Sequence, residues 1–135
     1  MGKIKEISLL SIKFNSRKGL LMSRYIPTDI TVLSKEKELH IIWKDGHKSR
    51  FPFGGLRKNC PCVFCQGGHG EMGKPMDPIQ FIADTPERLK LNNLKPSGNY
   101  ALHMFWSDGH STGIYRYQYL RDGCPVEAGI LPPSK

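Results

Sequence analysis

The chain repeats itself at an interval of about 63 residues, and this repeat restricts the possible fold more than any other feature. Leu39–His47 reads L-H-I-I-W-K-D-G-H and Leu102–His110 reads L-H-M-F-W-S-D-G-H, which gives six identities in nine positions. Downstream, Leu56–Pro61 matches Leu120–Pro125 at four of six positions, with one more residue in the second connection. Such a duplication predicts two similar supersecondary units packed around one core.

Each copy has the pattern of a β-hairpin followed by a short helical turn. Apolar and aromatic residues at Leu39–Trp43 and Tyr100–Trp106 predict strands, and the Asp-Gly pair after each predicts a type I′ turn. The return strands are expected at His47–Phe51 and Thr112–Tyr115. Further expected elements are strands at Asp29–Leu33 and Leu89–Leu94 and short helices at Leu56–Lys58 and Tyr117–Arg121. The pattern indicates an α+β fold that is mostly β.

The length and the charge distribution predict one domain with a basic segment before it. We expect residues 1–25 to be a flexible extension, residues 26–125 to form the domain and residues 126–135 to be a C-terminal tail. Residues 1–24 contain six Lys or Arg and one Glu, so they carry 6 − 1 = +5 of the chain's net charge of +8. The remaining +3 is too small to predict a nucleic-acid partner.

Hydropathy and cysteine usage favour a cytoplasmic protein that does not enter a membrane. No apolar run approaches the roughly 18 residues of a membrane-spanning helix, and Ile7–Ile12 is too short for a signal peptide. Three of the four cysteines lie within six residues, a spacing that suits metal coordination better than disulfides. The basic residues 1–22 leave an organellar targeting peptide, or a natural start at Met22, as open alternatives.

Cys60, Cys62 and Cys65 form the clearest chemical motif in the chain. Three thiols on one bend lose little chain entropy on binding a soft divalent ion, which then needs one more ligand. The expected form is a closed zinc site of the Cys3His type. Together with the repeat, it predicts a small single domain with two repeated β-hairpins, short helical turns and a zinc knuckle. The alternative is a set of buried free thiols. The residues leave five candidates for the fourth ligand, which are His47, His69, His103, His110 and Cys124.

Other conspicuous residues have simpler explanations than catalysis. Trp43 and Trp106 occupy matched positions inside apolar strands, which favours core packing over ligand stacking. The pair Cys62 and Cys65 has the spacing of a redox motif, but a third adjacent thiol favours metal binding. Gly67–Gly73 lacks the Lys and Ser or Thr of a nucleotide-binding loop. We therefore assign no catalytic or cofactor-binding residue.

Residues 28–125 resemble the N-terminal domain of γ-butyrobetaine hydroxylase and the stand-alone bacterial domains of that kind. The matching segments are Leu39–Pro52, the run Leu56-Arg57-x-x-Cys60-Pro61-Cys62-x-x-Cys65, Gly98–Leu102, Trp106–Tyr115 and Tyr119–Arg121. In the hydroxylase, the three cysteines of this motif and the His of the second Trp-x-Asp-x-His segment bind zinc. The resemblance therefore implies Cys60, Cys62, Cys65 and His110 as metal ligands.

The resemblance implies a structural metal and a protein partner rather than an enzyme. A closed four-ligand zinc has no open position for a substrate, and the oxygenase domain with its two-His, one-carboxylate iron site has no counterpart among these residues. We expect a zinc-stabilised, non-catalytic binding or adaptor domain. One alternative is an iron–sulfur assembly or carrier protein with a [2Fe–2S] cluster on the same ligands, because a similar domain is attached to plastid-type iron–sulfur assembly ATPases. Another is an accessory subunit of a separate 2-oxoglutarate-dependent oxygenase.

Overall fold

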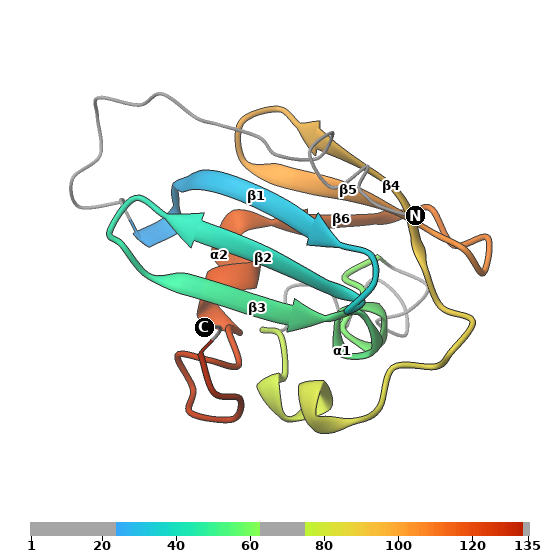
Figure 1. Ribbon diagram of the computed structural model, residues 1–135. Coiled ribbons are helices and arrows are strands. Elements are labelled where there is room, and N and C mark those ends of the chain that lie inside the picture. The colour runs from blue at the N-terminus through green and yellow to red at the C-terminus, as the bar shows by residue number, and fades with distance from the viewer. Residues whose placement is uncertain (1–23, 63–74, 134–135) are drawn as a thin grey trace.

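Two three-stranded antiparallel sheets and several short helices make up the fold (Figure 1). The computed structural model describes residues 24–62 and 75–133. The elements are β1 (Pro27–Leu33), β2 (Glu38–Trp43), β3 (Lys48–Pro52), α1 (Phe53–Lys58), the 3-10 helix η4 (Pro78–Ile82), β4 (Leu91–Ser97), β5 (Ala101–Trp106), β6 (Gly113–Arg116) and α2 (Tyr117–Asp122). The α+β, mostly β architecture predicted from the sequence is confirmed.

The repeat extends beyond the predicted hairpins to two complete β-β-β-α units. The first unit spans residues 27–58 and the second spans residues 91–122. The middle strand of each sheet pairs with the strands on either side, and the pairing shifts at the same place in both, between Pro27 and Asp29 and between Leu91 and Asn93. A bulge at matched positions indicates that the two units share their backbone geometry as well as their sequence.

The two hairpin turns differ from the predicted type I′ form. In the first turn, the amide of Gly46 donates to the carbonyl of Trp43, and the amide of Trp43 donates to the carbonyl of His47. Gly46 has a φ of +92°, whereas Asp45 does not have a positive φ. This is a three-residue loop ending in a glycine bulge. The prediction was wrong because the Asp carboxylate accepts the amide of the following His, at 3.1 Å in the first turn, and this local bond favours a different turn.

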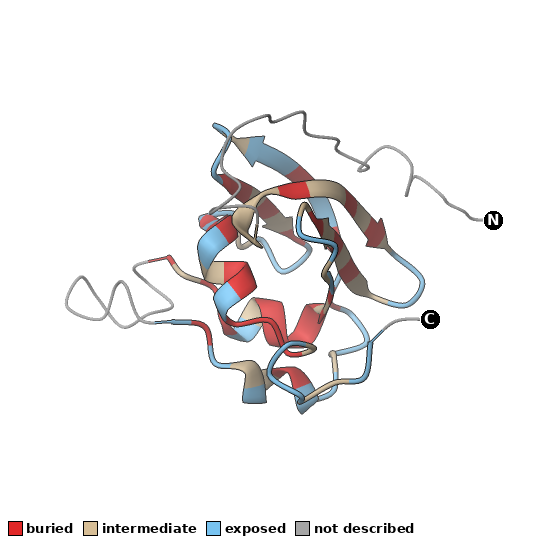
Figure 2. Cartoon of the chain, turned by 90° about the vertical axis from the view of Figure 1, so that its left-hand side faces the viewer, coloured by how far each residue is buried: buried red, intermediate tan, exposed pale blue. Residues whose placement is uncertain are grey.

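Each helix packs against the opposite unit, and this exchange closes a single core. Phe53 of α1 meets Trp106 of β5 edge to face with ring centroids 5.6 Å apart, and Tyr117 of α2 meets Trp43 of β2 in the same way at 6.4 Å. Both Trp side chains are buried. Figure 1 shows α2 behind the first sheet, and Figure 2 marks buried residues on both the strands and the helices.

Two glycines let the segment between the units pack tightly on α1. Gly54 and Gly55 both lie inside α1. A Cβ added at Gly55 would lie 2.3 Å from the ring of Phe81 in η4, and one at Gly54 would lie 2.9 Å from the Cα of Thr85. The close approach of residues 81–85 therefore requires glycine here, despite its low helix propensity.

Residues at both ends of the described chain contact the second unit. The hydroxyl of Tyr25 donates to Asp122 at 2.9 Å, and the guanidinium of Arg121 donates to the carbonyl of Arg24 at 2.9 Å. Within the expected C-terminal tail, Val126 and Leu131 pack against the core. Among the described residues, no helix is both long enough and apolar enough to cross a membrane.

Candidate metal centre

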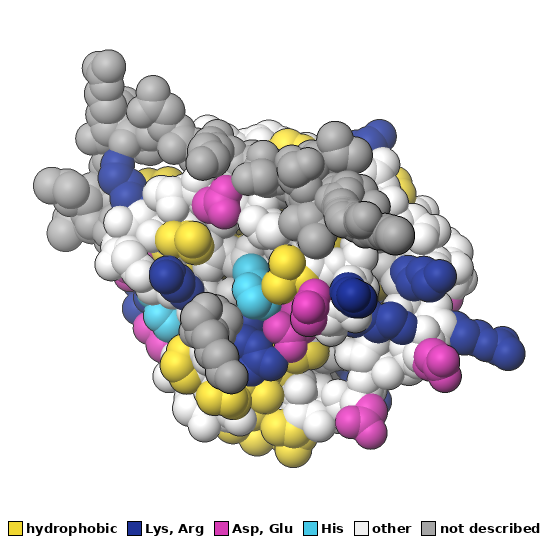
Figure 3. All heavy atoms as spheres, viewed as in Figure 1, with side chains coloured by type: hydrophobic (Ala, Val, Ile, Leu, Met, Phe, Trp, Pro, Cys, Tyr) yellow, Lys and Arg dark blue, Asp and Glu magenta, His cyan; other side chains and the backbone are white. Residues whose placement is uncertain are grey.

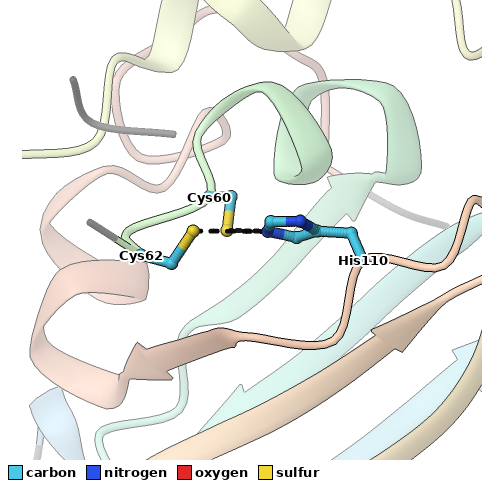
Figure 4. Close-up of side chains that lie close together, drawn as sticks. All are labelled: Cys60, Cys62 and His110. Atoms are coloured by element: carbon cyan, nitrogen blue, oxygen red, sulfur yellow. Dashed lines mark hydrogen bonds between the residues drawn. The ribbon is translucent and has the colours of Figure 1, made fainter. Parts of the chain in front are cut away.

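Two cysteines of the predicted knuckle and one histidine converge on one point (Figure 4). The Nε2 atom of His110 lies 3.0 Å from the Sγ atom of Cys60 and 3.4 Å from that of Cys62. Both cysteines are buried, and the histidine is partly exposed. The cysteines come from the end of the first unit and the histidine from the turn of the second unit. The site therefore joins the two halves of the molecule.

Asn59 fixes the backbone from which the cysteines project. It caps the C-terminus of α1, and its side-chain amide donates to the carbonyls of Gly55 at 3.1 Å and Asp77 at 3.0 Å. Its side-chain oxygen accepts the amide of Asp77 at 3.0 Å. These bonds hold the residues before and after 63–74 together. Cys65, the third predicted thiol, lies outside the described residues. It follows Cys62 by three residues, a chain length of at most about 10 Å.

Asp108 orients the histidine by bonding on both sides of the site. One carboxylate oxygen accepts the amide of His110 at 3.0 Å, and the other accepts Nε of Arg57 at 2.9 Å. Burial raises the pKa of Asp108, but the His110 amide and the Arg57 guanidinium outweigh burial, so its pKa lies below the usual value. The carboxylate is therefore charged at neutral pH. Because Arg57 lies in α1, this contact ties the second turn to the helix that carries the cysteines.

The donor set and its spacing fit a tetrahedral soft metal. With Zn–S near 2.3 Å and Zn–N near 2.0–2.1 Å, tetrahedral geometry separates sulfur from nitrogen by roughly 3.5 Å. The observed separations of 3.0 and 3.4 Å need only a small outward adjustment. Space for the Cys60 sulfur depends on Gly113, because an added Cβ there would lie 3.0 Å from it. Cys60, Cys62 and His110 could therefore hold a metal ion.

The other histidine of the repeat occupies the matching position across the molecule. The Nε2 atom of His47 lies 3.4 Å from the Sγ atom of Cys124, and the Ser49 hydroxyl lies 3.0 Å from the same sulfur. Burial, followed by the nearby Arg121 guanidinium, lowers the pKa of His47. Its imidazole is therefore neutral at neutral pH, and its unprotonated ring nitrogen can accept a hydrogen bond. Val126 follows Cys124 where Cys62 follows Cys60, so this pair has fewer metal-binding side chains.

Among the described residues, the other predicted ligand candidates lie apart from this centre. His103 is on the outer face of the second sheet, where its Nε2 atom lies 2.5 Å from the carbonyl of Ser111. His69 is outside the described residues. Cys124 contacts His47 rather than the other cysteines. The structure thus brings together three of the four residues that the resemblance implied, and says nothing of Cys65.

Sequence reasoning missed the charged residues that support the two His–Cys pairs. Asp45 and Arg121 form the same contact as Asp108 and Arg57, with the Arg121 nitrogens 3.0 and 3.1 Å from the Asp45 carboxylate. The Arg121 side chain is buried, and it also binds Glu127 at 2.9 Å. The signal was present in the sequence, because Asp and Arg recur in both copies. The recurrence becomes informative only once it is known that the Asp of each copy contacts the Arg of the other copy.

Comparisons with known proteins agree with this architecture. A family profile described as "Gamma-butyrobetaine hydroxylase-like, N-terminal" matches residues 30–121. A crystal structure of a protein of unknown function from Acidithiobacillus ferrooxidans, assigned to the DUF971 family, is 31% identical with a TM-score of 0.56, and the match covers 75% of this chain and 94% of that one. Two solution NMR structures share the fold. One is 23% identical with a TM-score of 0.59 and coverage of 84% and 77%, and the other is 22% identical with a TM-score of 0.54 and coverage of 78% and 77%. No curated protein matches the chain.

Proposed function

Because this chain belongs to the gamma-butyrobetaine hydroxylase-like N-terminal domain family, we propose that it is a zinc-stabilised, non-catalytic adaptor domain that binds another protein. The ligands are Cys60, Cys62, Cys65 and His110. The observation that carries the proposal is the convergence of a buried cysteine pair from the first unit with a histidine from the second. A metal there links the two halves of a small core, which is a structural role.

The ligand set itself argues against catalysis at the metal. Three thiolates and an imidazole complete a tetrahedral zinc shell and leave no position for water or substrate. Cys60 is 1% exposed and Cys62 is 8% exposed. The carboxylate nearest to the histidine, that of Asp108, is already bonded to the His110 amide and to Arg57. The site therefore stabilises the fold, and function belongs to the surface that the fold presents.

Metal analysis of protein purified without air tests the first half of the proposal. We expect a colourless protein with about one zinc per chain and no acid-labile sulfide. Removal of zinc by a chelator is expected to lower the melting temperature strongly, and zinc is expected to restore it. A brown protein with iron and sulfide would replace the proposal with the iron–sulfur assembly alternative, since a Cys3His set also holds a [2Fe–2S] cluster.

Affinity capture from the native cell tests the second half. The zinc-loaded domain is immobilised, and bound proteins are identified by mass spectrometry against a chelator-treated control. The adaptor proposal expects a partner that is retained only by the zinc-loaded form, because the metal holds the surface in shape. Capture of a 2-oxoglutarate-dependent oxygenase would identify the accessory-subunit alternative. Retention of no protein by the zinc-loaded domain would contradict an adaptor role.

A further inference from the structure

The outer faces of the two sheets differ in side chains although they share one register. In the first sheet His40 pairs with Arg50, and at the matched place in the second sheet His103 pairs with Ile114. The two sheets can therefore be compared position by position. Matched positions show which charged side chains each outer face has and which it lacks.

The first-sheet face satisfies its own charges. Arg50 donates to the Glu38 carboxylate at 2.7 and 3.2 Å, and His40 lies 2.9 Å from the same carboxylate. Arg50 also donates to the carbonyl of Pro132 at 2.9 Å, so the C-terminal segment contacts this face. Figure 3 views this side of the molecule, where Lys or Arg, Asp or Glu and His side chains lie next to one another. Such a face offers little net charge to a partner.

The described strands of the second sheet carry cations but no carboxylates. The position of Glu38 is taken by Ala101, and the position of Arg50 is taken by Ile114. Lys95 on β4 and Arg116 on β6 are exposed. The three strands β4, β5 and β6, all of them described, contain no Asp or Glu. Charge matching of the kind seen on the first sheet is therefore absent within these strands.

Apolar and aromatic side chains accompany the two cations. The Lys95 ammonium lies 5.5 Å from the centre of the Phe105 ring, and the Arg116 guanidinium lies 5.7 Å from that of Tyr100. Tyr100 is 51% exposed and Ile114 is 42% exposed. We call the surface of these five residues the second-sheet patch. An apolar centre with cationic flanks, rich in Tyr and Arg, is the usual composition of a protein-binding surface.

We propose that the second-sheet patch is the docking surface of the adaptor, and that it binds an acidic protein segment with apolar side chains. This inference rests on the proposed adaptor function and adds the surface and the partner chemistry. Carboxylates of the partner match Lys95 and Arg116, and its apolar side chains cover Ile114. A nucleic acid fits less well, because the two cations of the patch would neutralise only a few phosphates.

Fluorescence anisotropy with a labelled peptide of alternating Glu and Leu tests the patch. The zinc-loaded wild type is compared with Lys95→Glu/Arg116→Glu and with a control, Lys35→Glu/Lys48→Glu, which changes the net charge equally at exposed positions of the first unit. The patch variant is expected to bind about tenfold more weakly, and the control within about twofold of wild type. Ile114→Ser is expected to weaken binding without changing the net charge. Zinc content and melting temperature verify that each variant is folded.

Other outcomes of the peptide-binding experiment, and of affinity capture repeated with the patch variant, would contradict the inference. Equal weakening in the patch variant and the control would show a nonspecific charge effect. Tighter binding of oligothymidylate than of the acidic peptide would identify a nucleic-acid surface instead. If the wild type captures a cellular partner that the patch variant captures equally well, the patch is wrong and the adaptor function stands. If the wild type captures none, the adaptor function itself fails.

Discussion

His47 and Cys124 stand in the same relation as His110 and Cys60, on the opposite side of the molecule. The Nε2 to Sγ distance is 3.4 Å in the first pair and 3.0 Å in the second. In both, the histidine follows a hairpin turn and the cysteine follows the helix of the other unit. Among the described residues, only the pair of His110 and Cys60 has a further cysteine, Cys62, beside it. The first prediction follows from this difference.

Replacing the two histidines separately is expected to have unequal effects on metal binding. His110→Ala removes the nitrogen donor next to Cys60 and Cys62, so it should lower zinc retention and the melting temperature. His47→Ala should leave zinc bound, because its partner is Cys124. Zinc per chain after dialysis against a weak chelator measures the difference. Equal zinc loss in both variants would show that the pairing seen here does not decide the ligand.

The residues that face the two sulfurs are also expected to be non-equivalent. Ser49 and Gly113 hold matched places on β3 and β6. Gly113→Ser puts a Cβ about 3.0 Å from the Cys60 sulfur and from the Tyr115 ring, so it should crowd the site and weaken zinc retention about tenfold or more. Ser49→Gly removes the hydroxyl that accepts from Trp43 at 2.8 Å. This control should cost about 1 kcal/mol of stability and retain zinc.

If Gly113→Ser binds zinc as tightly as the wild type in a competition with a chromophoric chelator, the proposed role of Gly113 is wrong. The reciprocal result, zinc loss in Ser49→Gly alone, would place the metal on the other side of the molecule.

The two Asp–Arg contacts are expected to differ in energy because they differ in burial. The Arg121 side chain is 4% exposed and binds both Asp45 and Glu127, whereas the Arg57 side chain is 26% exposed. Arg121→Gln leaves two carboxylates near a buried site without their cation and should destabilise the fold by about 3 kcal/mol. Arg57→Gln should cost about 1 kcal/mol or less. Urea unfolding of the zinc-loaded proteins, followed by Trp fluorescence, measures both. Equal losses would indicate that burial does not set the strength of these contacts.

The Glu38 carboxylate is expected to add a pH-dependent term to stability. Burial raises its pKa, but hydrogen bonds from Arg50 and His40 outweigh burial and lower the pKa below the usual value of 4.5. A lowered carboxylate pKa stabilises the folded state above the unfolded pKa, and this contribution disappears as the pH falls through the folded pKa. Wild type should therefore exceed Glu38→Gln by about 1 kcal/mol at neutral pH.

That difference should shrink as the pH falls below about 4.5, the region in which an unfolded Glu titrates. Comparison of the two proteins at each pH cancels the effect of acid on zinc binding, which both share. Glu36→Gln, on the exposed turn between β1 and β2, serves as the control and should show no such trend. A stability difference that stays constant down to pH 3 would contradict the predicted contribution of Glu38.

The sequence alone determined the local structure and the duplication. Runs of apolar and aromatic residues placed β2 and β5 to within one residue of the predicted Leu39–Trp43 and Tyr100–Trp106, because such side chains pack well on a partly buried sheet. The close spacing of Cys60, Cys62 and Cys65 indicated metal-binding chemistry, because three thiols on one bend can bind one ion with little loss of chain entropy. The turn type was missed because it depends on a hydrogen bond that the Asp45 carboxylate accepts from the amide of His47, and this bond competes with the backbone preference.

Only the tertiary structure distinguished the two histidines on physical grounds. His47 and His110 both follow the pattern Trp-x-Asp-Gly, so this shared motif does not separate them. Each points across the interface between the units, and its surroundings are set by the end of the other unit, which is Cys60-Pro61-Cys62 for His110 and Cys124-Pro125-Val126 for His47. The choice rests on contacts between residues about 50 and 77 positions apart. Such contacts exist because each helix packs against the opposite unit, with Phe53 of α1 on Trp106 and Tyr117 of α2 on Trp43.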